Sequence, residues 1–250
     1  MNTFVNLNAQ EHGHLCISPK AINKFVSEQH MLLLSATEIT FAACDSPIFL
    51  NRNNQNGSWT ISAICALKQG ENLFMQQGSW QATYGPRTIA TYPFQLVSSS
   101  EQENTLSIGL DPSHAAFSDQ SGEALFDKNS QPSAYLQSVT SKLNEQAKDI
   151  ANSYQFCEHL ASLDLIKKVT LHVSYKEDHS DRIDGLYTIN EDRLKTLSSA
   201  QLVELNQRGF LTPINALLMS LYQLNKLIKL HNVRHQSKQI TAIKLEVSKA

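Results

Sequence analysis

The sequence has few charged residues and no excess of positive charge. Charged residues make up 18% of the 250 positions, and 21 Lys and Arg stand against 23 Asp and Glu, which gives a formal net charge of −2. A protein that binds nucleic acid needs clustered Lys and Arg to neutralise phosphates. The densest basic run here is the pair Lys167–Lys168. The composition therefore argues against nucleic acid as a partner.

Long apolar runs and paired cysteine motifs are also lacking. No stretch of about 18 apolar residues occurs, and no charged-then-apolar leader opens the chain. The four cysteines show no C-x-x-C spacing and have apolar neighbours. We therefore expect no membrane contact, a cytoplasmic location and reduced thiols in the core. These thiols are Cys16, Cys44, Cys65 and Cys157.

The length suits one large domain. Hydrophobic residues make up 41% of the chain, and a chain of this size can bury a core without disulfides or metal. We expect a single domain over residues 1–250, with a β-rich part at 1–131 and a helix-rich part at 132–250.

The β-rich part alternates apolar and polar residues between turn signals, as strands do. Asn56–Gly57 is typical of a tight hairpin turn. Ser35 and Glu38 have the spacing of a capping box, which predicts a helix from there to about Cys44. The expected strands are Thr3–Leu7, His14–Ser18, Pro47–Arg52, Thr60–Lys68, Asn72–Gln76, Phe94–Ser98 and Thr105–Leu110.

The helix-rich part begins after Pro132, where apolar residues recur at three- and four-residue intervals and predict a long helix. A second hairpin, Lys168–Tyr175 with Ile183–Asn190, follows. Asn190, Ser198 and Thr212–Pro213 are typical helix starts. We therefore expect an α+β fold, in which a bent, mostly antiparallel sheet is covered by a long central helix and a C-terminal helical segment.

Several short motifs occur in a characteristic order. They include His12-Gly-His14-Leu15, Gly70-Glu-Asn-Leu-Phe74, Tyr92-Pro-Phe94, Gly122-Glu-Ala-Leu-Phe-Asp127 and Leu202–Gly209. In order and spacing they resemble the bacterial SapC-like family, named from a locus for surface-layer protein secretion. The resemblance implies an accessory role in a surface-protein or peptide-maturation pathway and no particular reaction. One departure is Ala90–Thr91, where the family usually has two arginines.

The densest set of binding-capable side chains lies in a Pro-containing loop between two predicted strands. Aromatic rings beside one carboxylate and one guanidinium could clamp a peptide or a small polar ligand. Alternatively, the rings fill the core and Glu71 only pairs with Arg87. The candidate ligand-binding residues are Glu71, Trp80, Tyr84, Arg87 and Tyr92.

Metal and cofactor motifs are weak. His12 and His14 would point to one face if they lay on a strand. His179-Ser-Asp181 with His231 has the residue types of a two-histidine, one-carboxylate iron site, but predicted helices separate them. Sequence motifs of nucleophilic or nucleotide-binding sites are missing. We expect no catalytic residues, no metal and no cofactor.

The sequence therefore favours a non-catalytic factor that binds a protein or a peptide. One alternative is an iron- or zinc-dependent enzyme that uses histidines. Another is an oligomeric scaffold, since the oligomeric state does not follow from the sequence.

Overall fold

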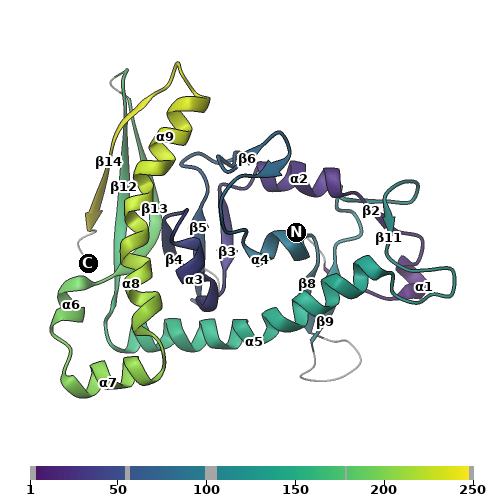
Figure 1. Cartoon of the computed structure of the whole chain (residues 1–250), viewed down its shortest axis with the longest axis horizontal. Coiled ribbons are helices and arrows are strands. Elements are labelled where there is room, and N and C mark those ends of the chain that lie inside the picture. Colours follow the sequence, from purple (N-terminus) through teal and green to yellow (C-terminus); the bar gives the residue numbers. More distant parts are fainter. Residues whose placement is uncertain (1–3, 54–56, 99–105, 178, 248–250) are drawn as a thin grey trace. The chain divides into compact units, whose positions relative to one another are not determined.

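The computed structural model describes residues 4–53, 57–98, 106–177 and 179–247, and it has the expected α+β fold with antiparallel sheets (Figure 1). Its contacts divide the chain into two compact units. Unit 1 comprises Met1–Ser27, Gln77–Ser79 and Arg87–Lys148, and unit 2 comprises Glu28–Gln76, Trp80–Pro86 and Asp149–Ala250. Each unit has its own apolar core. That residues 1–250 fold as a single domain stays a prediction.

Unit 1 contains two small antiparallel sheets, with strand orders β1-β9-β8 and β10-β2-β11. Its core joins the strands to the first half of the long helix α5, through residues such as Ile17, Phe94, Leu110 and Leu136. The elements that lie in it are β1 (Val5–Asn6), α1 (Ala9–His12), β2 (Cys16–Ile17), α2 (Pro19–Ser27), α4 (Arg87–Thr91), β8 (Gln95–Ser98), β9 (Leu106–Leu110), β10 (Phe117–Ser118), β11 (Glu123–Ala124) and the start of α5 (Ala134–Ser162).

His114 holds a loop of unit 1 in place. Its Nδ1 accepts the backbone N–H of Ala116 at 3.0 Å, its Nε2 is hydrogen-bonded to the hydroxyl of Tyr92, and the Tyr92 ring stacks on Phe25 with centroids 3.9 Å apart. Burial lowers the pKa of His114, and the nearby carboxylate of Asp111 opposes this effect. Protonation of Nδ1 would remove the lone pair that accepts the Ala116 N–H.

We therefore expect the stability of the protein to fall as the pH drops below 6.5. The unfolded chain, with an ordinary histidine pKa of about 6.5, binds more protons in this range than the folded chain does. The stabilising contribution is complete above that pH and is lost below it. Melting temperatures between about pH 7.5 and 5.5 would measure the slope. His114→Gln should flatten it, whereas His14→Gln, at an exposed position, should not; equal slopes in all three proteins would contradict the assignment.

Unit 2 is built on a six-stranded antiparallel sheet of order β14-β12-β13-β4-β5-β3. The long pair β12–β13 shifts register between Val169 and Leu171, a bulge that bends the strand. The strands of this sheet are β3 (Met31–Leu34), β4 (Ile48–Arg52), β5 (Trp59–Ile64), β12 (Ile166–Tyr175), β13 (Ser180–Ile189) and β14 (Ile240–Val247). The short strands β6 (Met75–Gln76) and β7 (Ser79–Trp80) flank a turn, and Gln77–Ser79 belong to unit 1.

Local signals explain three helix starts in unit 2. The backbone N–H of Ser35 donates to the Glu38 carboxylate at 2.8 Å, which confirms the predicted capping box. Asn190 and Ser198 are N-caps, as expected. The helices are η1 (Ala36–Glu38), α3 (Ile39–Ala42), the end of α5, α6 (Glu191–Lys195), α7 (Ser199–Gln207), α8 (Leu211–Ser220), η2 (Leu221–Gln223) and α9 (Leu224–Arg234).

The predicted start of α8 is wrong by two residues. Gly209 has a φ of +72°, and Phe210 rather than Thr212 precedes the first helical residue. Pro213 therefore occupies the first turn, where its missing N–H leaves no intrahelical bond unmade. Helices α8 and α9 lie along the sheet beside β12, β13 and β14 (Figure 1). Ile214 and Leu217 of α8 belong to the apolar core of unit 2, and Leu227 of α9 is also buried.

The strands predicted in residues 1–131 are confirmed, although most are shorter than expected. Thr3, Thr105 and the turn residue Asn56 lie outside the described residues.

Two of the four cysteines, Cys65 and Cys157, are buried as predicted. The prediction for Cys44 is wrong, because this residue is exposed after α3, and Cys16 is only half-buried. Within the described part of the chain, no helix is long and apolar enough to cross a membrane.

Candidate metal centre

Two histidines lie one turn apart at the end of α9. His231 belongs to the last turn of this helix, and His235 is the residue that caps it. Because residues four apart on a helix lie on the same side, the two imidazoles are neighbours, with ring centroids 4.6 Å apart. His231 is buried, whereas His235 is half-buried. The pair therefore faces both the interior and the solvent.

The segment Gly70–Phe74 brings a carboxylate to these histidines. Gly70 has a φ of +82°, a left-handed conformation that glycine adopts without strain and that turns the chain here. Asn72 Oδ1 accepts the N–H of Phe74 at 3.0 Å, and Leu73 and Phe74 are buried in the core. The neighbours of Glu71 thus form the turn or the core, while the Glu71 side chain reaches α9.

Arg234 fastens this segment to α9. One guanidinium nitrogen donates to the carbonyl oxygen of Asn72 at 2.8 Å, and the other donates to those of Leu73 and Met75 at 3.3 and 2.8 Å. A planar guanidinium with several donors suits such a group of carbonyls better than an ammonium does. The arginine between the two histidines therefore sets the position of Glu71 relative to them.

The carboxylate of Glu71 faces both imidazoles. Oε2 lies 2.7 Å from Nε2 of His235, and Oε1 lies 3.9 Å from Nδ1 of His231. Both Oε1 and Nδ1 are buried without a hydrogen-bond partner among the residues described. Two buried polar atoms left unpaired in this way are costly unless a cation or a proton lies between them.

A backbone carbonyl determines the tautomer of His231. Its Nε2 lies 3.0 Å from the carbonyl oxygen of Lys238, and a carbonyl can only accept, so Nε2 carries the proton. Burial lowers the pKa of His231, which favours the neutral ring. The neutral ring presents the lone pair of Nδ1 to Glu71. Metal-bound imidazoles are commonly oriented by such a carbonyl.

The three side chains offer one carboxylate oxygen and two imidazole nitrogens, all within 4.8 Å of one another. Ligand atoms lie about 2.0–2.2 Å from a zinc ion, so two of them are at most about 4.4 Å apart when bound. A small side-chain movement would gather them around one ion. Among the residues that the structure describes, this is the one group of three or more His, Cys, Asp or Glu side chains whose ligand atoms lie this close together.

Tyr175 lies beside the cluster, with its ring centroid 6.1 Å from that of His231. Its hydroxyl donates to Asp181 at 3.0 Å, and the other oxygen of Asp181 lies 3.0 Å from His179 Nε2. The predicted pattern of His179, Asp181 and His231 is therefore only partly brought together: His231 joins Glu71 and His235, while His179 and Asp181 bind each other.

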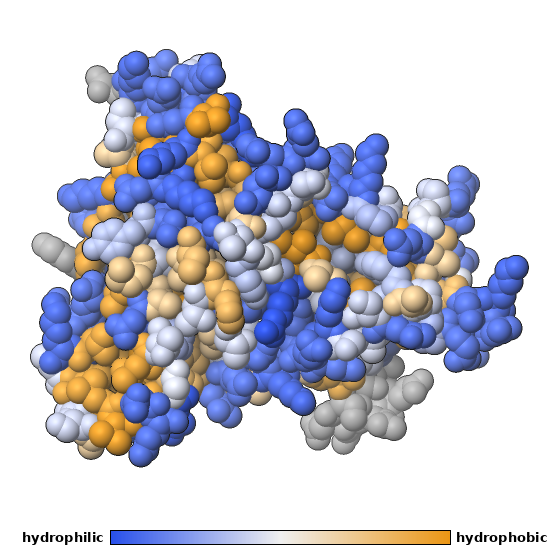
Figure 2. Space-filling model, in the orientation of Figure 1, coloured by the Kyte–Doolittle hydropathy of each residue, from blue (hydrophilic) through white to orange (hydrophobic). Residues whose placement is uncertain are grey.

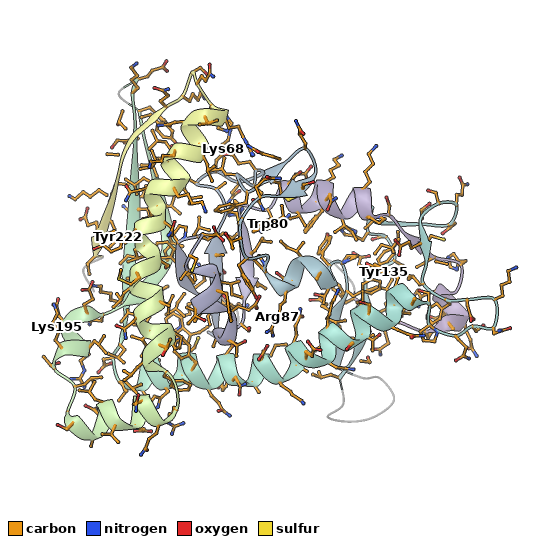
Figure 3. All side chains as sticks on the ribbon, in the orientation of Figure 1. Lys68, Trp80, Arg87, Tyr135, Lys195 and Tyr222 are labelled. Atoms are coloured by element: carbon orange, nitrogen blue, oxygen red, sulfur yellow. The ribbon has the colours of Figure 1, made fainter. Side chains whose placement is uncertain are left out.

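The candidate ligand-binding residues predicted from the sequence do not form one cluster. Trp80 Nε1 donates to the carbonyl oxygen of Tyr84 at 2.9 Å, and the Tyr84 hydroxyl donates to buried Glu38 at 2.8 Å. Arg87 begins α4, and Tyr92 follows it; Figure 3 labels Trp80 and Arg87. Trp80 and Tyr84 thus come together in unit 2 with intramolecular partners, whereas Arg87 and Tyr92 belong to unit 1.

The expected strand arrangement of His12 and His14 is wrong. His12 is the last residue of helix α1 and is buried, with Nδ1 against the backbone of Asn8. His14 is exposed, and its Nε2 lies 3.7 Å from Asp119. Their imidazoles therefore differ in secondary structure, burial and partners.

Sequence reasoning considered Glu71 and His231 separately and did not consider His235. One signal could have found the second histidine: His231-Asn-Val-Arg-His235 places two imidazoles at i and i+4 of a predicted helix, the spacing used by zinc-binding helices. Glu71 could not be added in this way, because it is 164 positions from His235.

Fold and site together define an α+β protein with a cluster of two histidines and one carboxylate. The chain belongs to the SapC family, as the motif resemblance predicted, and the family model matches residues 7–227. The matched range includes Glu71 and ends before His231 and His235. No curated protein and no solved structure matches the chain.

Proposed function

We propose that this SapC family protein binds one divalent transition-metal ion through Glu71, His231 and His235 and uses it in catalysis. The observation that carries the proposal is the pair of buried, unpartnered atoms, Glu71 Oε1 and His231 Nδ1, which face each other at 3.9 Å. A cation between them would give each atom the partner that it lacks. Zinc and iron(II) both accept this set of nitrogen and oxygen ligands.

An ion pair between Glu71 and His235, without a metal, explains less of the observed arrangement than a bound ion does. His235 Nε2 can pair with Glu71 Oε2, but this contact leaves Oε1 and His231 Nδ1 without partners. A proton on His231 Nδ1 would join them, but burial lowers the pKa of His231 and disfavours the charged ring. A metal ion satisfies all three ligands while His231 stays neutral.

The donor set favours catalysis over a purely structural role. Structural zinc sites are usually closed by four protein ligands rich in cysteine, whereas catalytic sites keep three ligands and an open position for water or substrate. His235 is half-buried, so solvent can reach this side of the cluster. Among the alternatives considered from the sequence, this arrangement favours the zinc- or iron-dependent enzyme.

Metal analysis tests the proposal. Metal-free protein is incubated with excess Zn²⁺, or with Fe²⁺ under anaerobic conditions, and desalted, and bound metal is then measured by mass spectrometry. We expect one ion per wild-type chain, and far less in Glu71→Gln, His231→Gln and His235→Gln, since two remaining ligands bind weakly. His179→Gln is the matched control and should keep the ion. Equal metal content in all five proteins would refute the assignment.

A protein or peptide partner is our second proposal. Its support is hydrophobic surface, which gathers over α7 and α9 on the face shown in Figure 2 and includes the exposed Val203 and Val233. A place in a surface-protein or peptide-maturation pathway rests on the family resemblance alone. The cytoplasmic location stays a prediction from the sequence.

A further inference from the structure

Strand β14 lies at one edge of the six-stranded sheet. It pairs with β12 along its length, from Ile240 opposite Tyr175 to Val247 opposite Val169. On its other side, no strand is found among the described residues. An edge strand of eight residues presents a row of backbone N–H and C=O groups that another strand can pair with.

Hydrophobic side chains border this edge. Ile243 and Leu245 line a groove of about 690 Å³ together with residues of α8 and η2, among them Met219 and Tyr222. Met219, Tyr222 and Val247 are 63, 70 and 50% exposed; Figure 3 shows Tyr222 on the side of the sheet where β14 lies. Exposed apolar side chains next to an unpaired edge favour a protein occupant over solvent.

The charge pattern of β14 fits a second copy of the same strand. When two copies pair antiparallel about a twofold axis at Leu245, each Lys244 lies opposite a Glu246, and each Ile243 lies opposite a Val247. An axis at Lys244 or at Glu246 would place like charges opposite each other. An axis at Ile243 would place Lys244 opposite Ala242 and leave the charges unpaired across the interface.

Lys244 and Glu246 are free to serve such an interface. Both are exposed, and in the single chain the one ionisable side chain that the structure records beside Glu246 is His172 on β12, whose Nε2 lies 3.3 Å from the Glu246 carboxylate. An opposite charge across the new strand pair would add to this contact. Main-chain hydrogen bonds would give the interface affinity, and the two Lys–Glu pairs would select its register.

We propose that two copies of this chain associate through β14, in an antiparallel register centred on Leu245, and join their six-stranded sheets into one. The inference is independent of the metal centre, since it rests on other residues of unit 2. It assigns the oligomeric form that the sequence left open.

Charge reversal tests the register. Sedimentation equilibrium of the full chain should give twice the 27.9 kDa mass of one chain at high concentration. Lys244→Glu or Glu246→Lys alone turns two attractive pairs into two repulsive ones and should raise the dimer dissociation constant at least about tenfold. The double variant Lys244→Glu/Glu246→Lys recreates both pairs and should restore association to within about threefold of wild type.

The control is Lys195→Glu, which changes an exposed charge on α6 that pairs with Asp192 and should leave the dissociation constant unchanged. If the wild-type chain stays monomeric at every concentration, the proposal is wrong, and a strand of a different protein becomes the candidate partner of β14. The Leu245 register would be wrong if the single variants had the dissociation constant of wild type. It would also be wrong if the double variant dissociated as readily as the single variants. Circular dichroism confirms that each variant is folded.

Discussion

Zinc is expected to raise the melting temperature of the metal-free protein by about 5 to 10 °C. A ligand present at about 100 times its dissociation constant stabilises the folded state by about 2.7 kcal/mol, and a chain of this size gains about 2–4 °C per kcal/mol. The effect requires the fold, because Glu71 and His235 are 164 positions apart and the unfolded chain does not hold them together.

Thermal unfolding with and without Zn²⁺ measures this shift, and a chelator should reverse it. Glu71→Gln and His231→Gln should melt at the same temperature with and without the ion. His172→Gln changes a more exposed histidine on β12 and should keep the full shift. If Glu71→Gln shows the wild-type shift, zinc is bound elsewhere and the assignment of the centre is wrong.

Replacing Arg234 by Leu should cost stability and metal affinity together. The side chain satisfies three backbone carbonyls of the segment that carries Glu71. Leaving buried acceptors without partners costs about 1–3 kcal/mol each, and part of this is recovered by water, so we expect a loss of about 2–4 kcal/mol in the free energy of unfolding. Because Glu71 is no longer fastened to α9, zinc affinity should fall at least about tenfold.

Denaturant unfolding and zinc titration measure the two effects of Arg234→Leu. Arg182→Leu removes an arginine that forms an exposed ion pair with Asp184, and it should change stability by less than about 1 kcal/mol and leave zinc affinity unchanged. Arg234→Lys should lie between Arg234→Leu and wild type, since one ammonium cannot reach all three carbonyls. Lower stability with unchanged affinity would show that Arg234 does not position Glu71.

Sequence reasoning succeeded where a signal is local. The capping box of Ser35 and Glu38 depends on residues three positions apart, and the long helix α5 depends on apolar residues that recur every three or four positions. The hairpin β12–β13 requires only two β-rich runs joined by a polar turn. All three are present as predicted, because neighbours along the chain supply the interactions that form them.

Some elements of the fold were not predicted, for different reasons. Helix α2 begins at Pro19 after Ser18, a start that was overlooked because the preceding residues were assigned to a strand. Strand β3 is only four residues long, too short for its alternation to be distinguished from a buried helical turn. Strand β14 alternates in the expected way, but its role depends on pairing with β12, which is distant along the chain.

The metal centre was also only partly predictable from the sequence. His231 and His235 are neighbours by helix geometry, so a sequence pattern can associate them. Glu71 reaches them only because Gly70 turns the chain, Asn72 stabilises the turn and Arg234 ties the turn to α9. A spacing rule cannot anticipate contacts between segments this far apart.

The sequence by itself determined the α+β class and the positions of the main strands and helices, since short-range periodicity, caps and turns encode them, and its ordered motifs pointed to the family. Tertiary structure alone decided that each of the two units has an apolar core among the described residues, that Glu71 meets His231 and His235, and that β14 lies at a sheet edge. The physical reason is distance along the chain: these features arise from burial and hydrogen bonds between segments that only folding brings together.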